Sequence, residues 1–441
     1  MFLFISEDLF QEKFISLLTF FKLLKITFMR IYVIFFCVFL CFICCSDTKK
    51  NSEYAVIDIA SSLGKYQRIY CSELFSSIEL IPLETNEDCL LDIRAYPKIT
   101  LNDSIILMHG NNMHQLYAFD RTGKFMNKIG NIGQGPNEYT TLAGGISLST
   151  DKSIIYVSDM NKIIAYDYQG NYIQSFPLPN PDNLTLSNVS YLEDNLFVGQ
   201  VHYNGNNRFK YCLFDQKGDT INTFPNHIFF NRNGSWLSTT DGGHFPARVD
   251  NRLYLKDFIN DTIYELSNRA LQPVFSFYFK NNSSNHEKLE TFTPNNDFVV
   301  WKFLGMPNYF FYQIKIPASI SVPKSRPVYN HMINQFIQED HAIYGLYDIV
   351  HNLNTLLDTD NYYQKGIIND LNGGLSLIPR SYAGNGEVAD VWNVMDMREI
   401  LNKEYFDHQV IKDSKGHQEL IKMLKNMKDD DNPVVVVVKL H

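Results

Sequence analysis

Four polar residues follow runs of apolar, strand-forming residues at points that a repeating fold would superimpose. They are His109, Asp159, Asp257 and Asp370. A ring of such side chains can bind a cation, a sugar or a basic peptide, because carboxylate oxygens carry charge and accept hydrogen bonds. Aspartate is also a common turn residue, and that simpler interpretation is the stronger one. We therefore keep the four residues as candidates for ligand binding and assign none of them to catalysis.

No other constellation in the sequence points to catalysis, a cofactor or a metal. The twelve histidines form no HExxH motif, and no GxSxG motif occurs. The only close histidine pair, His109 and His114, has no carboxylate between its members. We expect neither a metal nor a cofactor. We leave enzymatic activity open and favour its absence.

A glycine-rich segment, Gly130-x-x-Gly133-x-Gly135, has a superficial likeness to a phosphate-binding loop. That chemistry needs a helix N-terminus after the glycines, whereas a proline and a β-rich segment follow here. We expect a structural turn made by Gly133, Gly135, Pro136, Glu138 and Tyr139. Both glycines should take backbone angles that a Cβ would penalise, and the proline should fix φ. The glutamate should accept backbone hydrogen bonds, and the tyrosine should pack between structural units.

The elements that would position these residues are visible as a repeat. An apolar or aromatic residue followed by Asp-x-x-Gly occurs at Asp120, Asp167 and Asp215, which are 47 and 48 residues apart. Apolar residues follow each aspartate at six and nine positions, and these are Met126 and Ile129, Ile173 and Phe176, Ile221 and Phe224. Two β-rich runs joined by such a turn predict a hairpin, and the period is that of a propeller blade.

Other strand-like runs fit the same organisation. Residues 104–108, 154–157, 196–201 and 253–255 each precede a hairpin of the repeat or a degraded copy of it. Residues 263–267 and 343–348 are interpreted as a fourth and a fifth copy. Residues 54–59 and 78–85 predict two further strands near the start of the folded region.

The C-terminal part changes period. Residues 394–405 and 420–427 have helical spacing, and five valines follow at 434–438. A continuous β-branched run predicts a strand buried on both faces, which suits closure of a ring by terminal strands. We therefore expect an all-β fold, a six-bladed β-propeller of four-stranded blades over residues 54–441. A short two-helix insertion should occupy about 394–428.

The N-terminal region predicts export. Residues 1–45 are interpreted as a signal segment, in which 1–28 are an annotation artefact if Met29 is the true start. A basic residue followed by about 14 apolar residues suits a secretory signal. The polar residues from 46 onward make Cys45 the expected lipidated residue, with Cys44 as the alternative and a retained membrane anchor as another. Residues 46–53 are expected to form a tether.

Composition limits the remaining possibilities. The chain has 441 residues, 45% apolar content and a net charge of −9, so it can bury a large core and is not expected to bind nucleic acid. Cys71, Cys89 and Cys212 form no CxxC pair. A Cys71–Cys89 disulfide is possible in an oxidising compartment, although buried thiols are the favoured expectation.

Residues 119–139 contain Phe-Asp-x-x-Gly, then Ile-Gly, then Gly-Gln-Gly-Pro-Asn-Glu-Tyr. This order resembles the six-bladed β-propeller lipoproteins of Gram-negative envelope bacteria, relatives of the NHL and TolB-like propellers. The resemblance implies a six-bladed ring held in the cell envelope by an N-terminal lipid, in the outer membrane. It implies no established activity.

These observations leave three functional hypotheses. The first is a non-enzymatic binding or scaffold module for an unknown ligand, which would be a glycan, a peptide or a protein. The second is an envelope lyase or hydrolase with its site at the central channel mouth. The third is a purely structural envelope component, which would show a large apolar surface patch and no pocket.

Overall fold

The structure is a computed structural model, and it describes the compact unit Tyr54–His441 with gaps. The described residues are 54–91, 98–110, 114–149, 151–183, 185–201, 206–227, 229, 247–249, 252–256, 260–280, 298–317, 319–323, 328–330, 335–337, 342–358 and 365–441. The predicted signal segment, Cys44, Cys45 and the tether therefore lie outside the described residues.

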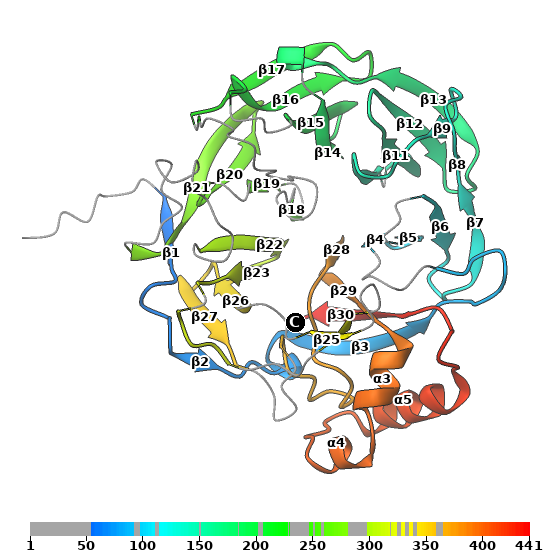
Figure 1. The fold of residues 1–441 in the computed structure, drawn as a ribbon, viewed down its shortest axis with the longest axis vertical. Coiled ribbons are helices and arrows are strands. Elements are labelled where there is room, and N and C mark those ends of the chain that lie inside the picture. Colours follow the sequence, from blue (N-terminus) through cyan, green and yellow to red (C-terminus); the bar gives the residue numbers. More distant parts are fainter. Residues whose placement is uncertain are drawn as a thin grey trace, which may run out of the picture. The chain divides into compact units, whose positions relative to one another are not determined.

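Six sheets surround one axis and confirm the predicted six-bladed propeller (Figure 1). Within each blade the four strands are antiparallel, and the first strand is the innermost. Blade 1 contains β4 (Lys98–Leu101), β5 (Ile106–His109), β6 (Leu116–Phe119) and β7 (Phe125–Ile129). Blade 2 contains β10 (Ile146–Ser149), β11 (Ile154–Ser158), β12 (Lys162–Asp167) and β13 (Tyr172–Pro177). Blade 3 contains β14 (Leu186–Tyr191), β15 (Leu196–Val201), β16 (Phe209–Asp215) and β17 (Thr220–Pro225).

Blades 4 to 6 follow in the same order around the ring. Blade 4 contains β18 (Ala247–Val249), β19 (Arg252–Lys256), β20 (Thr262–Ser267) and β21 (Ala270–Tyr278). Blade 5 contains β22 (Val299–Met306), β23 (Tyr309–Lys315), β26 (Ala342–Asp348) and β27 (Leu353–Leu357). Blade 6 contains β28 (Ser381–Gly384), β29 (Glu387–Trp392), β30 (Val434–Leu440) and β3 (Phe75–Pro82). The predicted fourth and fifth repeat copies are the third strands β20 and β26, as the repeat requires.

The ring closes in blade 6, where strands from the two ends of the folded unit pair. The valine strand β30 lies between β29 and the N-terminal strand β3 and is antiparallel to both. Its five valines have at most 4% of their surface exposed. The sequence pattern predicted this pairing, because a strand that has neighbours on both edges and packs on both faces must be apolar throughout.

The N-terminal segment also follows the rim of the ring before it reaches blade 6. Strand β1 (Ala55–Asp58) pairs in parallel with β21 and is a fifth strand of blade 4. Strand β2 (Tyr66–Gln67) pairs in parallel with β27 and does the same for blade 5. A short helix, α2 (Cys71–Leu74), then leads into β3. One segment therefore ties three consecutive blades together.

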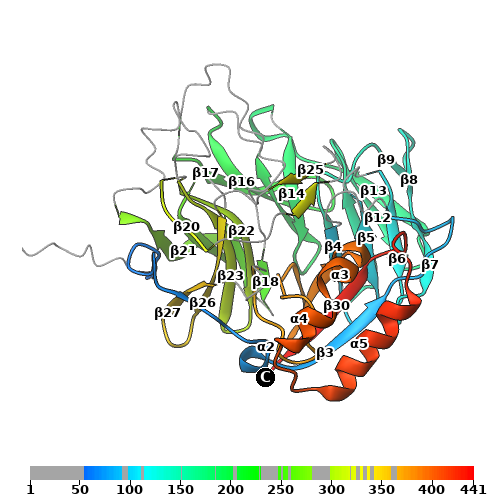
Figure 2. The same ribbon diagram turned by 60° about the horizontal axis from the view of Figure 1, so that its bottom comes forward.

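Helices interrupt blade 6 between β29 and β30. Three are present where two were predicted: α3 (Val394–Ile400), α4 (Lys403–Asp407) and α5 (Ser414–Asn426). The predicted first helix is broken at Leu401, because the Asn402 side chain accepts a hydrogen bond from Tyr405 N and starts a new helix. Helix α5 packs alongside β3 on the outside of the ring (Figure 2). None of the helices within the described part of the chain is long and apolar enough to cross a membrane.

The Asp-x-x-Gly repeat forms the turns between the third and fourth strands of blades 1 to 3. In each turn the aspartate Oδ1 accepts backbone hydrogen bonds from inside the turn, as Asp120 does from Thr122 N at 2.8 Å. The glycines Gly123, Gly170 and Gly218 have φ of +86°, +81° and +81°. A Cβ on each would also meet the outer strand of the preceding blade. The repeat therefore encodes both the turn and the contact between blades.

Short pairings complete the described secondary structure. Strands β8 (Asn131–Ile132) and β9 (Glu138–Tyr139) pair in parallel, and β24 (Val328–Asn330) pairs with β25 (Gln335–Ile337). A 3-10 turn, η1, covers Pro181–Asn183. Cys71, Cys89 and Cys212 are buried free thiols, so the Cys71–Cys89 disulfide does not form.

Candidate functional site

The two faces of the ring differ in the length of their connections. One face carries the links between first and second strands and between third and fourth strands, and we call it the turn face. Among the shortest of those links is residues 250–251, and the longest is residues 120–124. The opposite face, which we call the loop face, carries the links between second and third strands and the links between blades. The shortest of these is residues 159–161 and the longest is residues 393–433. Long connections on a rigid scaffold are where binding sites concentrate, so the loop face is the candidate functional face.

Every blade places at least one buried polar side chain near the loop-face end of its second strand, and we compare the longest in each blade. Each of these residues lies within the last three positions of that strand or directly after it, and each is at most 7% exposed. From blade 1 to blade 6 they are His109, Asp159, Gln200, Lys256, Gln313 and Asp390. A buried polar group must find a partner or weaken the fold, so each partner indicates what the residue does.

Asp159 holds the end of the connection between blades 1 and 2. Its carboxylate accepts hydrogen bonds from Thr140 N at 3.0 Å, from Thr140 Oγ1 at 2.5 Å and from Thr141 N at 3.3 Å. Three donors from its own chain occupy the oxygens that a ligand would use. The geometry supports an anchoring role for Asp159 in the loop that leads to β10.

Asp390 has the equivalent arrangement in blade 6, and the sequence analysis missed it. Its carboxylate accepts from Ile378 N at 2.9 Å and pairs with Arg380 Nε at 2.7 Å. Both donors belong to the connection that enters β28. The only sequence signal is an aspartate inside an otherwise apolar strand, Val388 to Trp392, and a single strand gives no means of recognising its partners.

His109 and Lys256 are also held by nearby backbone. His109 Nδ1 lies 3.1 Å from Gly110 O, and burial lowers the pKa of its imidazole to about 4, so this side chain is neutral at physiological pH. Lys256 Nζ donates to Asn260 O at 2.5 Å and lies 5.8 Å from the centre of the Phe277 ring. Neither residue was identified as a backbone anchor from the sequence, because both partners are set by loop geometry.

The structure describes three of the four predicted ligand residues, His109, Asp159 and Asp370. Asp257 lies outside the described residues. Asp370 does not follow a second strand, because Ile367 and Ile368 form isolated bridges in the connection between blades 5 and 6. Its carboxylate accepts from Ser72 N at 2.9 Å and Ser72 Oγ at 2.6 Å, and pairs with Lys412 Nζ at 2.8 Å.

These contacts make Asp370 a junction between three segments. It joins helix α2, the connection between blades 5 and 6, and the helical insertion. The hydrogen bonds and the charge of Lys412 outweigh burial and lower the pKa of the Asp370 carboxyl below its usual range. The expectation that Asp370 follows a blade strand, as His109 and Asp159 do, is wrong, because Ile367 and Ile368 form only isolated bridges.

The glycine-rich loop has a positive φ, +60°, only at Gly130, whereas Glu138 closes the turn at Gly133 and Gly135. Neither Gly133 nor Gly135 has a positive φ, so the expected reason for both glycines is wrong. Instead, Glu138 Oε2 accepts from Gly135 N at 2.9 Å, and a Cβ on Gly133 would collide with that carboxylate. Lys162 Nζ donates to Gly135 O at 2.5 Å from the next blade. Pro136 is part of this closed turn, and its side chain is exposed to solvent.

Tyr139 anchors the same loop between blades 1 and 2. Its ring packs in the apolar cluster that the two blades share. Its hydroxyl donates to Ile129 O at 3.0 Å and accepts from Leu116 N at 3.2 Å. Burial raises the pKa of this phenol to about 12. The loop that contains the glycine-rich segment is thus fixed at Glu138, at Tyr139 and at the threonines bound by Asp159.

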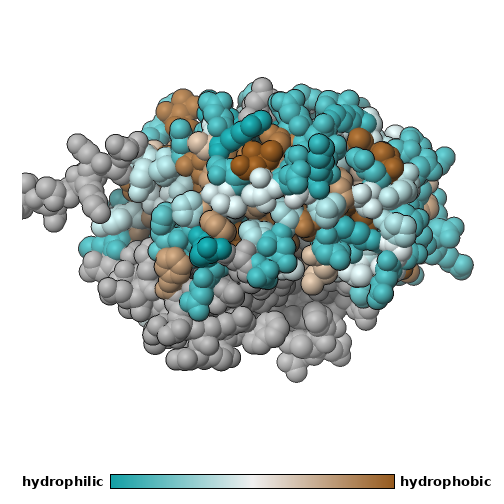
Figure 3. Space-filling model, turned by 90° about the horizontal axis from the view of Figure 1, so that it is seen from above, coloured by the Kyte–Doolittle hydropathy of each residue, from teal (hydrophilic) through white to brown (hydrophobic). Residues whose placement is uncertain are grey.

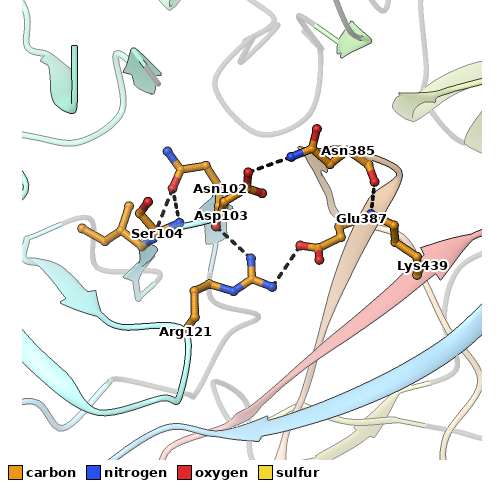
Figure 4. Close-up of polar contacts among 8 residues, drawn as sticks. Asn102, Asp103, Ser104, Arg121, Asn385, Glu387 and Lys439 are labelled. Atoms are coloured by element: carbon orange, nitrogen blue, oxygen red, sulfur yellow. Dashed lines mark hydrogen bonds and ion pairs between the residues drawn. The ribbon is translucent and has the colours of Figure 1, made fainter. Parts of the chain in front are cut away.

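A second polar network lies on the turn face where blades 1 and 6 meet (Figure 4). Arg121 donates to Glu387 Oε2 at 2.9 Å and to Asn102 O at 2.8 Å. Asn385 Nδ2 donates to Asp103 Oδ2 at 2.7 Å, and Lys439 Nζ donates to Asn385 O. These residues come from both ends of the ring, so we call them the closure network and assign them to stability.

Direct signs of metal or catalytic chemistry are absent from the part of the chain that the structure describes. No group of three or more histidine, cysteine or carboxylate side chains there could hold a metal. Burial raises the pKa of the Cys71 and Cys212 thiols, which is the opposite of the change that activates a nucleophile.

Comparisons with known proteins identify the fold and not an activity. A family model described as Domain of unknown function (DUF4934) matches residues 54–439. An exported protein of Bacteroides fragilis has a similar structure, with a TM-score of 0.61, 16% identity, and 88% of this chain and 99% of that chain covered. A DUF4221 family member from Bacteroides vulgatus has a TM-score of 0.49 and 12% identity, and 83% of this chain and 97% of that chain are covered. No curated protein matches the sequence.

Proposed function

We propose that this chain, which belongs to the DUF4934 family, is a non-enzymatic binding or scaffold propeller of the cell envelope that takes its ligand or protein partner on the loop face. The observation that carries the proposal is the contrast between the two faces. Tight turns cover the turn face, whereas long connections cover the loop face and buried side chains such as Asp159 and Asp390 hold them. Preorganised loops bind at a lower entropic cost than mobile ones.

The alternatives are less well supported. An envelope lyase or hydrolase would need a base or acid that is free to reach a substrate, whereas the carboxylates of Asp159 and Asp390 are occupied by their own chain. A purely structural component would need a large apolar patch. In the part of the ring's side that Figure 3 colours, the surface is mostly hydrophilic with separate hydrophobic areas.

Membrane attachment is part of the proposal. The apolar run that ends at Cys45 and the resemblance to propeller lipoproteins related to the NHL and TolB-like families both support a lipid on that residue. We expect the protein in the outer membrane of a bacterial envelope. Cys45→Ser should release the protein from the membrane fraction or stall its processing, with Cys44→Ser as the matched control. Unchanged membrane retention and processing of the Cys45→Ser protein would contradict a lipid on Cys45, and unchanged retention of both variants would contradict the lipid anchor.

Binding on the loop face can be tested with defined probes. The full chain would be titrated with purified envelope polysaccharide, with peptidoglycan fragments and with a peptide library, and each recovered probe would be weighed by mass spectrometry. We expect at least one probe to bind and to be recovered unchanged. Chemical conversion of a probe would favour the enzyme, and no binding to any of them would contradict a ligand-binding module.

A pair of exposed apolar residues separates the two faces. Met160 lies in the loop-face link between β11 and β12, and Val350 lies in the turn-face link between β26 and β27; they are 58% and 65% exposed. Met160→Glu should weaken binding, because it places a charge at the loop face, whereas Val350→Glu should leave it unchanged. Equal effects of the two substitutions would contradict the assignment to the loop face.

A further inference from the structure

The N-terminal segment enters the ring in a defined direction. Strand β21 is the fourth strand of blade 4 and runs from the turn face toward the loop face, because the link before it, residues 268–269, is a turn-face link. Strand β1 lies beside β21, pairs with it in parallel and starts at Ala55, opposite Phe275 (Figure 1). The chain that precedes Ala55 is therefore directed toward the turn face.

The predicted tether limits how far the ring lies from its lipid. Residues 46–53 separate Cys45 from the described residues, and eight residues span at most about 28 Å when fully extended. A tether that continues in the direction of β1 passes residues 270–274 of β21 and reaches the turn-face end of blade 4. To reach a bilayer on the loop face, it would have to reverse its direction. The direct path thus brings the turn-face rim of blade 4 to the membrane.

The two neighbours of blade 4 expose apolar side chains at the same rim. In blade 5, Val350 lies in the turn-face link before β27 and Leu353 is the first residue of β27; they are 65% and 59% exposed. In blade 3, Ile221 is the bulged second residue of β17 and is 40% exposed. A single exposed apolar residue needs no explanation, whereas apolar residues on both sides of the lipid-bearing blade indicate a membrane contact.

Blade 4 places a positive charge between these side chains. Arg269 is exposed at the tip of the two-residue link that joins β20 to β21. Both residues of this link, Asn268 and Arg269, have positive φ, as a tight type I′ hairpin turn requires. Asn222 Nδ2 of blade 3 donates to Arg269 O at 3.1 Å and fixes the turn. A guanidinium held at this rim matches the geometry of a lipid phosphate.

We propose that the turn-face rim of blades 3 to 5 rests on the phospholipid bilayer that holds the N-terminal lipid, so that the loop face points away from the membrane. The inference rests on the lipid anchor of the proposed function. Ile221, Val350 and Leu353 enter the interfacial region, and Arg269 pairs with lipid phosphates. The anchor makes this contact effectively intramolecular, so a few side chains suffice. The long connections of the loop face stay open to a ligand.

Quenching by spin-labelled lipid tests this orientation in the full chain, produced in a host that processes lipoproteins and reconstituted in phosphatidylethanolamine–phosphatidylglycerol vesicles. An environment-sensitive fluorophore would be attached to Val350→Cys on the turn face or to Met160→Cys on the loop face. Cys71, Cys89 and Cys212 are buried, and the unsubstituted chain measures any labelling of them. We expect quenching at position 350 to be at least threefold stronger than at position 160. Equal quenching, or stronger quenching at 160, would overturn the orientation.

Substitutions separate a contact made by the rim from an orientation set by the tether alone. With the fluorophore on Ile221→Cys, the pair Val350→Glu and Leu353→Glu should reduce quenching at least twofold, because carboxylates favour water over the interface. Met160→Glu on the loop face is the matched control and should leave the quenching unchanged. All of these positions are exposed, so the thermal midpoint should not fall. Unchanged quenching in the double variant would overturn the membrane contact of the rim.

Vesicle flotation separates this proposal from the anchor on which it rests. If the native chain floats with the vesicles while quenching is equal at positions 350 and 160, only the orientation is wrong. If the native chain does not float, the lipid anchor and the orientation both fail. The ligand titrations of the loop face use no vesicles, so their outcome is independent of both results.

Discussion

At the scale of single residues, the buried polar groups of the second strands act first on the chain itself. Asp159 was predicted as a ligand residue and the glycine-rich loop as a structural turn, and the structure brings the two together through Thr140. The Asp159 carboxylate accepts from two backbone N–H groups and one side-chain hydroxyl of its own chain, so its contribution is to fix a loop. The residue types could be selected from the sequence, whereas their partners depend on loops whose paths no local pattern specifies.

The first residue-scale prediction concerns the closed turn at Gly133. Gly133→Ala should lower the free energy of unfolding by about 1–2 kcal/mol, because a Cβ there would displace the Glu138 carboxylate from Gly135 N. In a Glu138→Ala background the same substitution should have almost no effect, and equilibrium denaturation of the four proteins would measure that coupling. An equal loss in both backgrounds would show that Glu138 is not the reason for the glycine.

The second residue-scale prediction is a pH dependence. Burial lowers the pKa of folded His109 to about 4, whereas an unfolded histidine titrates near 6.5. The unfolded chain therefore binds the extra proton first, so the stability due to His109 is complete above about pH 6.5 and is lost as the pH falls toward 4. The full loss is roughly 3 kcal/mol.

Denaturation of the native chain and of His109→Gln between pH 7 and pH 4 would measure this effect. The variant should show a flatter stability profile in that window, because glutamine does not titrate. His408→Gln, which changes an exposed histidine of the helical insertion, is the control and should keep the native slope. Parallel profiles for all three proteins would contradict a neutral, buried His109.

At the scale of elements, the repeat concerns the outer strand of each blade as well as the hairpin that precedes it. Apolar residues at six and nine positions after the aspartate cannot share one face of a regular strand, since side chains alternate. The structure resolves the conflict with a bulge in each outer strand: Met126, Ile173 and Ile221 have no partner residue and are 39–45% exposed. Ile129, Phe176 and Phe224 are buried.

Other elements could not be predicted from local pattern. The break between α3 and α4 depends on the Asn402 side chain acting as a cap, although the apolar spacing continues across it. The parallel strands β1 and β2 are only four and two residues long and gain their partners from distant blades. Ring closure was predictable, because five consecutive valines at the end of a β-rich chain require two strand neighbours.

The element-scale prediction concerns Asn432, the residue two positions before β30. It is fully buried, its Nδ2 donates to Glu84 O at 2.6 Å and Cys89 O at 2.9 Å, and its Oδ1 accepts from Leu91 N at 2.8 Å. Asn432→Asp keeps the shape and places a carboxylate against two carbonyl oxygens. We expect a loss of about 3 kcal/mol or more in the free energy of unfolding.

Thermal and urea denaturation would measure this loss. Gln418→Glu makes the same amide-to-carboxylate change on an exposed position of α5 and should alter stability by no more than about 0.5 kcal/mol. A native-like midpoint for Asn432→Asp would show that the start of β30 is held by the strand pairing alone.

At the scale of the whole molecule, closure determines how the ring responds to damage. Blade 6 takes three strands from the C-terminal part of the chain and one from the N-terminal part, and β1 and β2 connect that strand to blades 4 and 5. An open array of repeats can unfold one unit at a time, since each unit contacts only its neighbours. A closed ring has no terminal unit to lose, so its blades should unfold together.

The last prediction follows from the closure network. Arg121 and Glu387 join blades 1 and 6, and their side chains are 20% and 24% exposed, so the pair should contribute about 1 kcal/mol. Arg121→Met should lower the urea midpoint measured by far-ultraviolet circular dichroism, which reports all blades. The same shift should appear in tryptophan fluorescence, to which Trp301 of blade 5 and Trp392 of blade 6 contribute. Coincident transitions in the native chain and in the variant indicate one cooperative ring. If Arg121→Met separates the two signals, so that fluorescence changes before circular dichroism, the blades unfold independently and closure through blade 6 does not govern stability.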